Sequence, residues 1–178
     1  MIYTVDKPQN HSRIWLKETA MTPKRIEQGL DLLTRIAEEN PGGNSRHTGW
    51  SAKLAAGIWV KNELIAVGWN QAKSHPLQNK FPKQAGYVHL HAEIHAITCA
   101  LKRFSEDELR AAKTTLMVVR TKRKDHRRNS SWVRGIAKPC NGCAAAIAHY
   151  RIKNVVWSED FHDHNHMPWT CVKCELTL

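Results

Sequence analysis

The sequence predicts an α/β domain in which helices pack on a central sheet. Short apolar runs alternate with segments of helical spacing in the order helix, strand, strand, helix, strand, helix, strand. This alternation is typical of layered α/β domains. The chain has 178 residues, which fits one compact domain, and no internal repeat interrupts it.

The first helix is expected to begin at Thr22 and Pro23, because threonine caps helix N-termini well and proline is favoured in the first turn. The sequence NPGG at residues 40–43 ends this helix. Between these signals, apolar residues recur at helical spacing: Ile26, Leu30, Leu33, Ile36 and Ala37. Residues 1–20 lack such a pattern and are expected to form an N-terminal arm.

Two strands should follow, joined by a tight turn. The apolar runs KLAAGIWV, residues 53–60, and ELIAVGWN, residues 63–70, are separated only by Lys61 and Asn62. A long loop with two prolines comes next, and helical spacing resumes from about residue 91 to residue 104.

The second half of the chain adds two strands and one helix. TTLMVVRTK, residues 114–122, predicts a buried strand, and NVVWSE, residues 154–159, predicts another. A helix is expected between them, from Cys140 to about Tyr150. Beyond the strand that ends at residue 159, too few residues remain for a full helix and a strand. TCVKCELTL is therefore expected to form only a short edge strand.

The composition is basic, with 27 Lys and Arg against 16 Asp and Glu and a net charge of +11. This surplus favours phosphorylated or polyanionic partners, unless it is simply a soluble basic surface. We expect a cytoplasmic protein without membrane association, because neither a secretory signal nor a bilayer-length apolar run is present. In that compartment, five cysteines with two C-x-x-C pairs indicate metal binding or thiolate chemistry rather than disulfides.

The stretch YVHLHAEIHAI, residues 87–97, holds three histidines and one glutamate. His91 and His95 have the spacing of a zinc-protease helix, but such a helix carries its glutamate directly after the first histidine. Two helical positions lie about 200° apart. His91 and Glu93 can therefore converge only if His91 lies at the very start of the helix. His89 is expected to be a hydrogen-bonded loop residue. His95 is expected to be a structural histidine, with contact to the substrate as the alternative.

The stretch PCNGC, residues 139–143, opens the next helix and places Cys140 and Cys143 on one side of its first turn. Together with His91 they make a Cys2His set with an open fourth position, which is typical of catalytic zinc. Two helix N-termini would face the ion and stabilise the thiolates. Zinc lowers the pKa of a water in the open position, and Glu93 beside it would move the proton.

This pairing of H-x-E with P-C-x-x-C, within residues 46–159, resembles the zinc-dependent cytidine and deoxycytidylate deaminase superfamily, in particular its small phage-type dCMP deaminases. The resemblance implies a three-layer α-β-α sandwich with a central mixed sheet of four to five strands. It implies that His91, Cys140 and Cys143 bind one catalytic Zn²⁺. It also implies that Glu93 shuttles the proton while hydroxide attacks the base and ammonia leaves.

The same resemblance implies a cytosine nucleotide as substrate, a free one such as dCMP, and a homo-oligomeric enzyme. Asn70 and the backbone of Ala92 would contact that substrate. Two alternatives stay open: a deaminase of cytosine or adenine in single-stranded DNA or RNA, and a zinc-containing nucleic-acid-binding protein without turnover. Glu93 argues against the second alternative, since a structural zinc site has no need of a glutamate beside an open position.

Residues 120–138, RTKRKDHRRNSSWVRGIAK, form a basic insertion relative to compact members of the superfamily. Three hypotheses compete for it: a disordered solvated loop, a clamp for the phosphate of a free nucleotide, and a grip on a nucleic-acid backbone with Trp132 stacked on a base. The cations of the segment include Arg120, Lys122, Lys124, Arg127, Arg128, Arg134 and Lys138.

Residues 161–178 form a tail rich in metal-ligand residue types. A second, structural zinc would find enough ligands here, whereas the alternative is a loosely packed tail with partly buried thiols. The candidate ligands are His162, His164, His166, Cys171 and Cys174.

Overall fold

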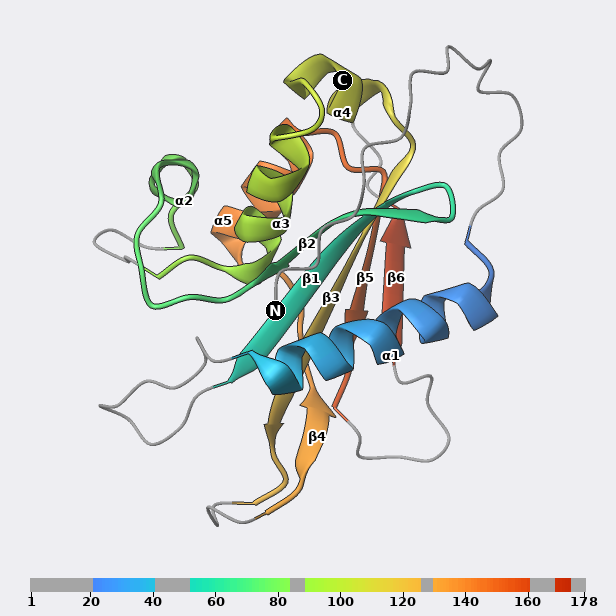
Figure 1. Cartoon of the computed structure of the whole chain (residues 1–178), viewed down its shortest axis with the longest axis vertical. Coiled ribbons are helices and arrows are strands. Elements are labelled where there is room, and N and C mark those ends of the chain that lie inside the picture. The colour runs from blue at the N-terminus through green and yellow to red at the C-terminus, as the bar shows by residue number, and fades with distance from the viewer. Residues whose placement is uncertain (1–20, 41–51, 84–88, 126–129, 161–168, 174–178) are drawn as a thin grey trace.

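The fold, seen in a computed structural model, is a mixed sheet with helices on both faces (Figure 1). The structure describes residues 21–40, 52–83, 89–125, 130–160 and 169–173. Five strands follow the order β2-β1-β3-β5-β6, and β4 pairs only with β3. Strands β3 and β5 are parallel, while the other pairs are antiparallel. The expected three-layer α/β architecture is present, with β4 as a sixth strand beyond the expected four to five.

Helix α1, Pro23–Glu39, covers one face of the sheet (Figure 1). It begins where the sequence predicts, because the Thr22 hydroxyl accepts a hydrogen bond from the backbone N–H of Arg25. Its apolar stripe packs on β1, Lys53–Val60, and β3, Thr114–Arg123. The buried members of this core are Ile26, Leu30, Leu33, Ala37, Ala55, Trp59, Met117, Val119 and Val156.

Helices α3, Ala92–Leu101, and α5, Asn141–His149, cover the opposite face and share its larger core. Helix α3 lies unusually close to β2, Glu63–Trp69. A Cβ atom at Gly68 would come within 2.2 Å of the backbone nitrogen of Ala96. Only glycine permits this approach, which holds the start of α3 against the sheet.

Two short helices lie in segments where the sequence analysis placed no helix. Helix α2, Pro76–Lys80, lies in the long loop before α3, and helix α4, Glu106–Ala111, follows α3. Strand β4, Trp132–Gly135, pairs with the last residues of β3. The described part of the basic insertion is therefore a β-hairpin that extends beyond the rest of the sheet, not a disordered loop (Figure 1).

The C-terminal part has the expected strands. Strand β5, Asn154–Ser158, lies between β3 and β6, and β6, Trp169–Lys173, is the short edge strand. The predicted N-terminal arm and most of the Cys/His-rich tail lie outside the described residues. None of the helices within the described ranges has the length and apolarity to cross a bilayer.

Candidate active site

The first half of the site is the start of α3. Leu90 pairs with Gln71 through two backbone hydrogen bonds, at 2.9 and 3.0 Å, which carries the chain to the helix from the end of β2. His91 is then the N-cap residue, with extended backbone angles and no capping bond from its side chain. The imidazole therefore leaves the chain ahead of the helix, which is the placement that convergence of His91 with Glu93 requires.

The second half is the start of α5. Cys140 is the N-cap residue in an extended conformation, and its side chain likewise makes no capping bond. Cys143 follows in the first turn and is buried. The chain reaches this point from β4 along β5, where the backbone N–H of Ala137 donates to the Ser158 carbonyl at 2.9 Å.

These two helix starts bring His91, Cys140 and Cys143 together. The Nδ1 atom of His91 lies 3.2 Å from the Cys143 sulfur and 3.5 Å from the Cys140 sulfur. All three donor atoms lie within 4.8 Å of one another. Tetrahedral zinc with ordinary bond lengths separates such donors by about 3.5–3.8 Å. The three side chains thus fit one zinc ion after small adjustments.

The pKa values of the two thiols are shifted in opposite directions. A hydrogen bond from the Cys143 side chain lowers the pKa of Cys140 to about 3, although partial burial acts in the opposite direction. The same hydrogen bond, together with burial, raises the pKa of Cys143. For His91, burial lowers the pKa, but the hydrogen bond with Cys140 and the nearby charge of Glu93 outweigh it and raise the pKa overall. The site thus pairs one thiolate with an imidazole that is easily protonated. Binding of a metal cation here would release the protons of the imidazole and of the second thiol.

Glu93 lies in the first turn of α3, and only 3% of it is exposed. Burial raises the pKa of its carboxyl group. Its Oε2 atom is shielded from solvent and has no hydrogen-bond partner in the described part of the chain. Leaving a buried acceptor unpaired costs about 1–3 kcal/mol, so this oxygen suits a site that takes a water molecule or a substrate group.

Gln78 of α2 is a site residue that the sequence analysis missed. Its side chain is fully buried, its Oε1 atom accepts from the backbone N–H of His91 at 2.9 Å, and its Nε2 atom donates to the Phe81 carbonyl at 3.0 Å. That carbonyl in turn packs against α5, where a Cβ at Gly142 would lie only 2.6 Å from it. Gln78 therefore links the start of α3 to the start of α5.

The two predicted substrate residues, Asn70 and Ala92, differ in how many of their hydrogen-bonding groups already have partners. The Asn70 side chain accepts from the backbone N–H of Leu54 at 2.8 Å and from Asn40 at 3.0 Å, and it donates to the Ala52 carbonyl at 3.1 Å. One of its amide hydrogens is not used by these bonds. Ala92 is the first residue of α3, so its N–H belongs to the first turn, whose donors have no partner within the helix.

The neighbouring histidines have other surroundings. The Nδ1 atom of His95 lies 3.0 Å from the backbone nitrogen of Trp69 and 2.9 Å from the Gln71 side-chain nitrogen, and burial lowers the pKa of its imidazole. His89 is exposed, ahead of α3. Neither belongs to the group formed by His91 and the two cysteines.

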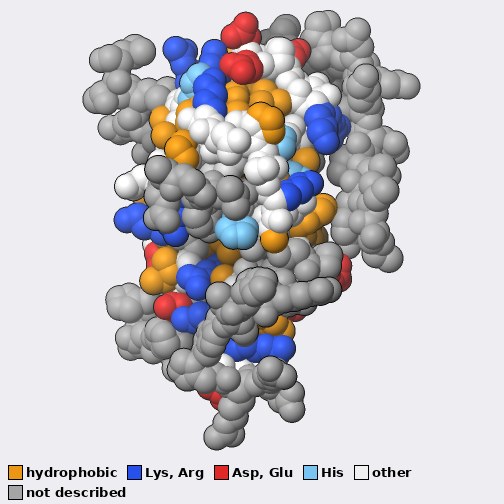
Figure 2. Space-filling view, turned by 90° about the vertical axis from the view of Figure 1, so that its left-hand side faces the viewer, with side chains coloured by type: hydrophobic (Ala, Val, Ile, Leu, Met, Phe, Trp, Pro, Cys, Tyr) orange, Lys and Arg blue, Asp and Glu red, His pale blue; other side chains and the backbone are white. Residues whose placement is uncertain are grey.

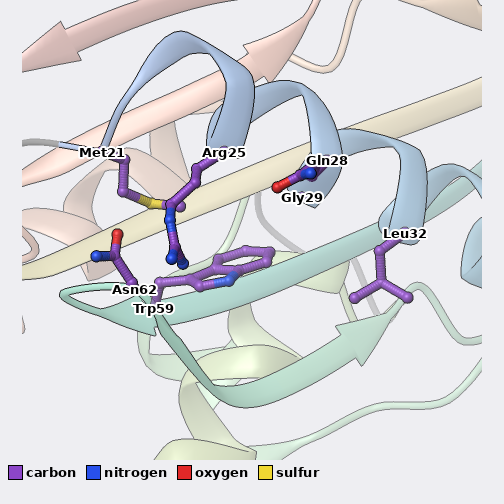
Figure 3. Close-up of a pocket in the computed structure, with 7 residues that line it drawn as sticks. All are labelled: Met21, Arg25, Gln28, Gly29, Leu32, Trp59 and Asn62. Atoms are coloured by element: carbon purple, nitrogen blue, oxygen red, sulfur yellow. The ribbon is translucent and has the colours of Figure 1, made fainter.

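The predicted second metal site cannot be assembled from described residues. Cys171 is exposed on β6, while the four other candidate ligands lie outside the described ranges. A shallow pocket of about 160 Å³ lies on the opposite face, between α1 and the β1–β2 turn (Figure 3). Its lining includes Arg25, Trp59 and Asn62, but no carboxylate, thiol or imidazole that could ligate zinc.

Comparisons with known proteins give one family and several structural neighbours. The family model of the cytidine and deoxycytidylate deaminase zinc-binding region matches residues 43–159, whereas no curated protein matches the sequence significantly. The dCMP deaminase of cyanophage S-TIM5, solved with dCMP and dUMP, is 16% identical with a TM-score of 0.49, over 80% of this chain and 86% of that chain. RibD of Acinetobacter baumannii is 20% identical with a TM-score of 0.41, over 76% of this chain and 28% of that chain.

Proposed function

The chain belongs to the family of the cytidine and deoxycytidylate deaminase zinc-binding region, and from this premise we propose that it is a zinc-dependent hydrolytic deaminase. The proposed reaction converts the cytosine base of a free nucleotide, such as dCMP, to uracil. One observation carries the proposal: the His91, Cys140 and Cys143 donors lie within 4.8 Å of one another, beside buried Glu93, one oxygen of which has no partner among the described residues.

We assign the metal to these three side chains. Zinc held by one imidazole and two thiolates keeps a fourth position open and lowers the pKa of a water there to about 7. The uncapped N-termini of α3 and α5 support the thiolates through their partial positive charge. Gln78 fixes the backbone of His91, so that its Nδ1 atom faces the two sulfurs.

Glu93 is assigned the proton transfers. Its carboxylate takes the two protons of the water in turn and returns them to the base, one to the ring and one to the departing amine, so that one water enters and one ammonia leaves per base converted. Burial supports this role, because a raised pKa brings the carboxyl group closer to the working pH, where proton uptake and release both become easier. The N–H of Ala92 and the remaining amide hydrogen of Asn70 are assigned to base and sugar contacts.

A free nucleotide is favoured over a polynucleotide because several basic side chains in the described part of the hairpin are engaged with the protein itself. Lys122 lies 2.7 Å from Asp160, and Arg134 pairs with Glu27 and Asp31 of α1. The ring of Trp132 has Arg123 and Lys53 within 4.4 and 5.0 Å of its centroid, so it does not offer an open stacking platform. Basic side chains nevertheless spread along the side of the molecule that carries α2, α3 and α5 (Figure 2), which suits a phosphorylated substrate.

The test is a substrate competition with a matched pair of variants. The purified protein is incubated with cytosine and adenine nucleosides, their phosphates, and single-stranded DNA and RNA oligomers, and mass spectrometry detects exchange of an amine for oxygen. We expect conversion of a cytosine nucleotide. Glu93→Gln should lower kcat at least about 100-fold because the proton carrier is lost, with zinc content unchanged.

Glu63→Gln is the control, since Glu63 is exposed at the start of β2, and it should behave like the parent protein. Unchanged turnover in Glu93→Gln would refute the proposed role of Glu93. Conversion confined to oligomers would replace the free nucleotide by a polynucleotide. Zinc binding without any conversion would favour the binding protein that lacks turnover.

A further inference from the structure

The proposed function leaves the cations of residues 120–138 without an assigned role. Three of the six in the described part have partners within the protein. Lys122 pairs with Asp160, Arg134 pairs with α1, and Arg123 donates to the Ser130 carbonyl at 2.5 Å while it covers Trp132. Lys124 is exposed near the end of the hairpin. Arg120 differs from all of these.

Arg120 is half-buried in the longest strand of the sheet. Its Nε atom is shielded from solvent and has no hydrogen-bond partner among the residues that the structure describes. Its backbone N–H, in contrast, donates to the Ser158 hydroxyl at 3.3 Å. A guanidinium donor that is buried without an acceptor is costly. The side chain is therefore placed to meet an anion that comes from elsewhere.

The alternation of β3 determines which face Arg120 lies on. Leu116 and Val118 belong to the core shared with α3 and α5, whereas Met117 and Val119 belong to the core under α1. Successive residues of a strand point to opposite faces. Arg120 continues the set of Leu116 and Val118, so it lies on the face that carries the metal ligands and Glu93.

The strand register determines its level along that face. Arg120 lies opposite Leu54 on β1, and Leu54 bonds to Asn70 through both its N–H, at 2.8 Å, and its C=O, at 3.3 Å. The next residue, Gln71, pairs with Leu90, directly before His91. Arg120, Leu54 and Asn70 thus form one row across the sheet at the level where α3 begins.

We propose that Arg120 binds the 5′-phosphate of the nucleotide whose base is deaminated, and that it selects a phosphorylated substrate over the nucleoside. The proposal rests on the proposed function and deepens it. Asn70 lies in the same row, between Arg120 and the start of α3, as a sugar contact between phosphate and base would. The planar guanidinium fork matches the oxygens of a phosphate and remains charged at every working pH.

The test compares two substrates that differ only in the phosphate, dCMP and deoxycytidine. Arg120→Met keeps the length of the side chain but removes the charge, and it should lower the ratio of kcat/KM for dCMP over deoxycytidine about 10- to 150-fold, as expected for a charge-assisted contact. Arg120→Lys keeps the charge without the fork and should restore part of the ratio. Lys124→Met removes an equal charge from the same hairpin and should leave the ratio unchanged.

Product binding separates this proposal from the deaminase assignment itself. Calorimetry with dUMP and deoxyuridine measures phosphate recognition without turnover, and Arg120→Met should weaken dUMP binding alone. An unchanged substrate ratio, an equal loss for both substrates, or turnover confined to oligomers would each overturn the phosphate role. If the parent protein deaminates nothing but Arg120→Met still loses dUMP selectively, the phosphate site stands and the assigned reaction fails.

Discussion

Two pairs of helices in this protein begin in opposite ways. Helices α1 and α4 begin with the hydroxyl residues Thr22 and Ser105, whose side chains accept hydrogen bonds from the first turn. Helices α3 and α5 begin with His91 and Cys140, whose side chains make no such bond. Helices α1 and α4 thus have ordinary stabilising caps. In α3 and α5, the side chains of the two N-cap residues, His91 and Cys140, instead face each other.

The difference indicates what the proposed metal site requires of a helix start. A good cap contributes about 1 kcal/mol to stability, which α3 and α5 forgo. In return, the positive ends of both helices face the two sulfurs. Experiments that exchange the two kinds of helix start should therefore separate function from stability.

The largest effect should come from giving α5 an ordinary cap. Cys140→Ser removes a proposed metal ligand but supplies a hydroxyl that can bond to the first turn. We expect a loss of zinc affinity beyond the 10- to 100-fold that outer hydrogen bonds contribute, together with loss of turnover. Urea unfolding in the presence of a chelator should show equal stability or a gain of up to about 1 kcal/mol. A variant that retains one zinc per chain would contradict the ligand assignment.

A smaller effect should follow from loosening α3 without touching a ligand. Gln78→Leu removes the acceptor for the His91 N–H and the donor to Phe81, so zinc affinity should fall about 10- to 100-fold. The visible spectrum of the cobalt-substituted protein should shift, because the imidazole changes its orientation. Gln28→Leu, at an exposed position of α1, serves as the control. Equal cobalt spectra in all three proteins would show that Gln78 does not position the ligand.

The smallest effects should come from the ordinary caps. Ser105→Ala breaks a reciprocal pair with Glu108 and should lower the free energy of unfolding by about 1 kcal/mol. Thr22→Ala should cost less, near the lower limit of about 0.5 kcal/mol, since its bond to Arg25 is exposed and 3.4 Å long. Both changes should leave zinc content and turnover intact. A loss of zinc in Ser105→Ala would remove the distinction between the two kinds of helix start.

The sequence predicts best those features that depend on neighbours along the chain. Thr22 and Pro23 mark the start of α1, and the Lys61–Asn62 turn separates β1 from β2, because capping and turn preferences are local. The spacing of H-x-E and P-C-x-x-C also predicts that His91, Cys140 and Cys143 lie together, and their donor atoms do lie within 4.8 Å of one another.

What the sequence did not reveal depends on distant partners. Gln78 lies in a proline-containing loop, and both its partners are backbone groups whose positions follow only from the folded path. Strand β4 was missed because its segment is rich in charged residues. The charge of Arg134 is balanced by Glu27, which lies more than 100 positions earlier in the chain. No periodicity or motif reports such long-range pairing.

The distance along the chain between the ligands has a consequence for folding. His91 and Cys140 are 49 positions apart, with β3 and its hairpin between them. An ion bound to both closes a loop around that whole segment, and a cross-link of this length is worth about 4 kcal/mol in chain entropy. Metal binding at the proposed site would therefore favour the assembled fold over the unfolded chain, and loss of the ion would remove this cross-link from both helix starts at once.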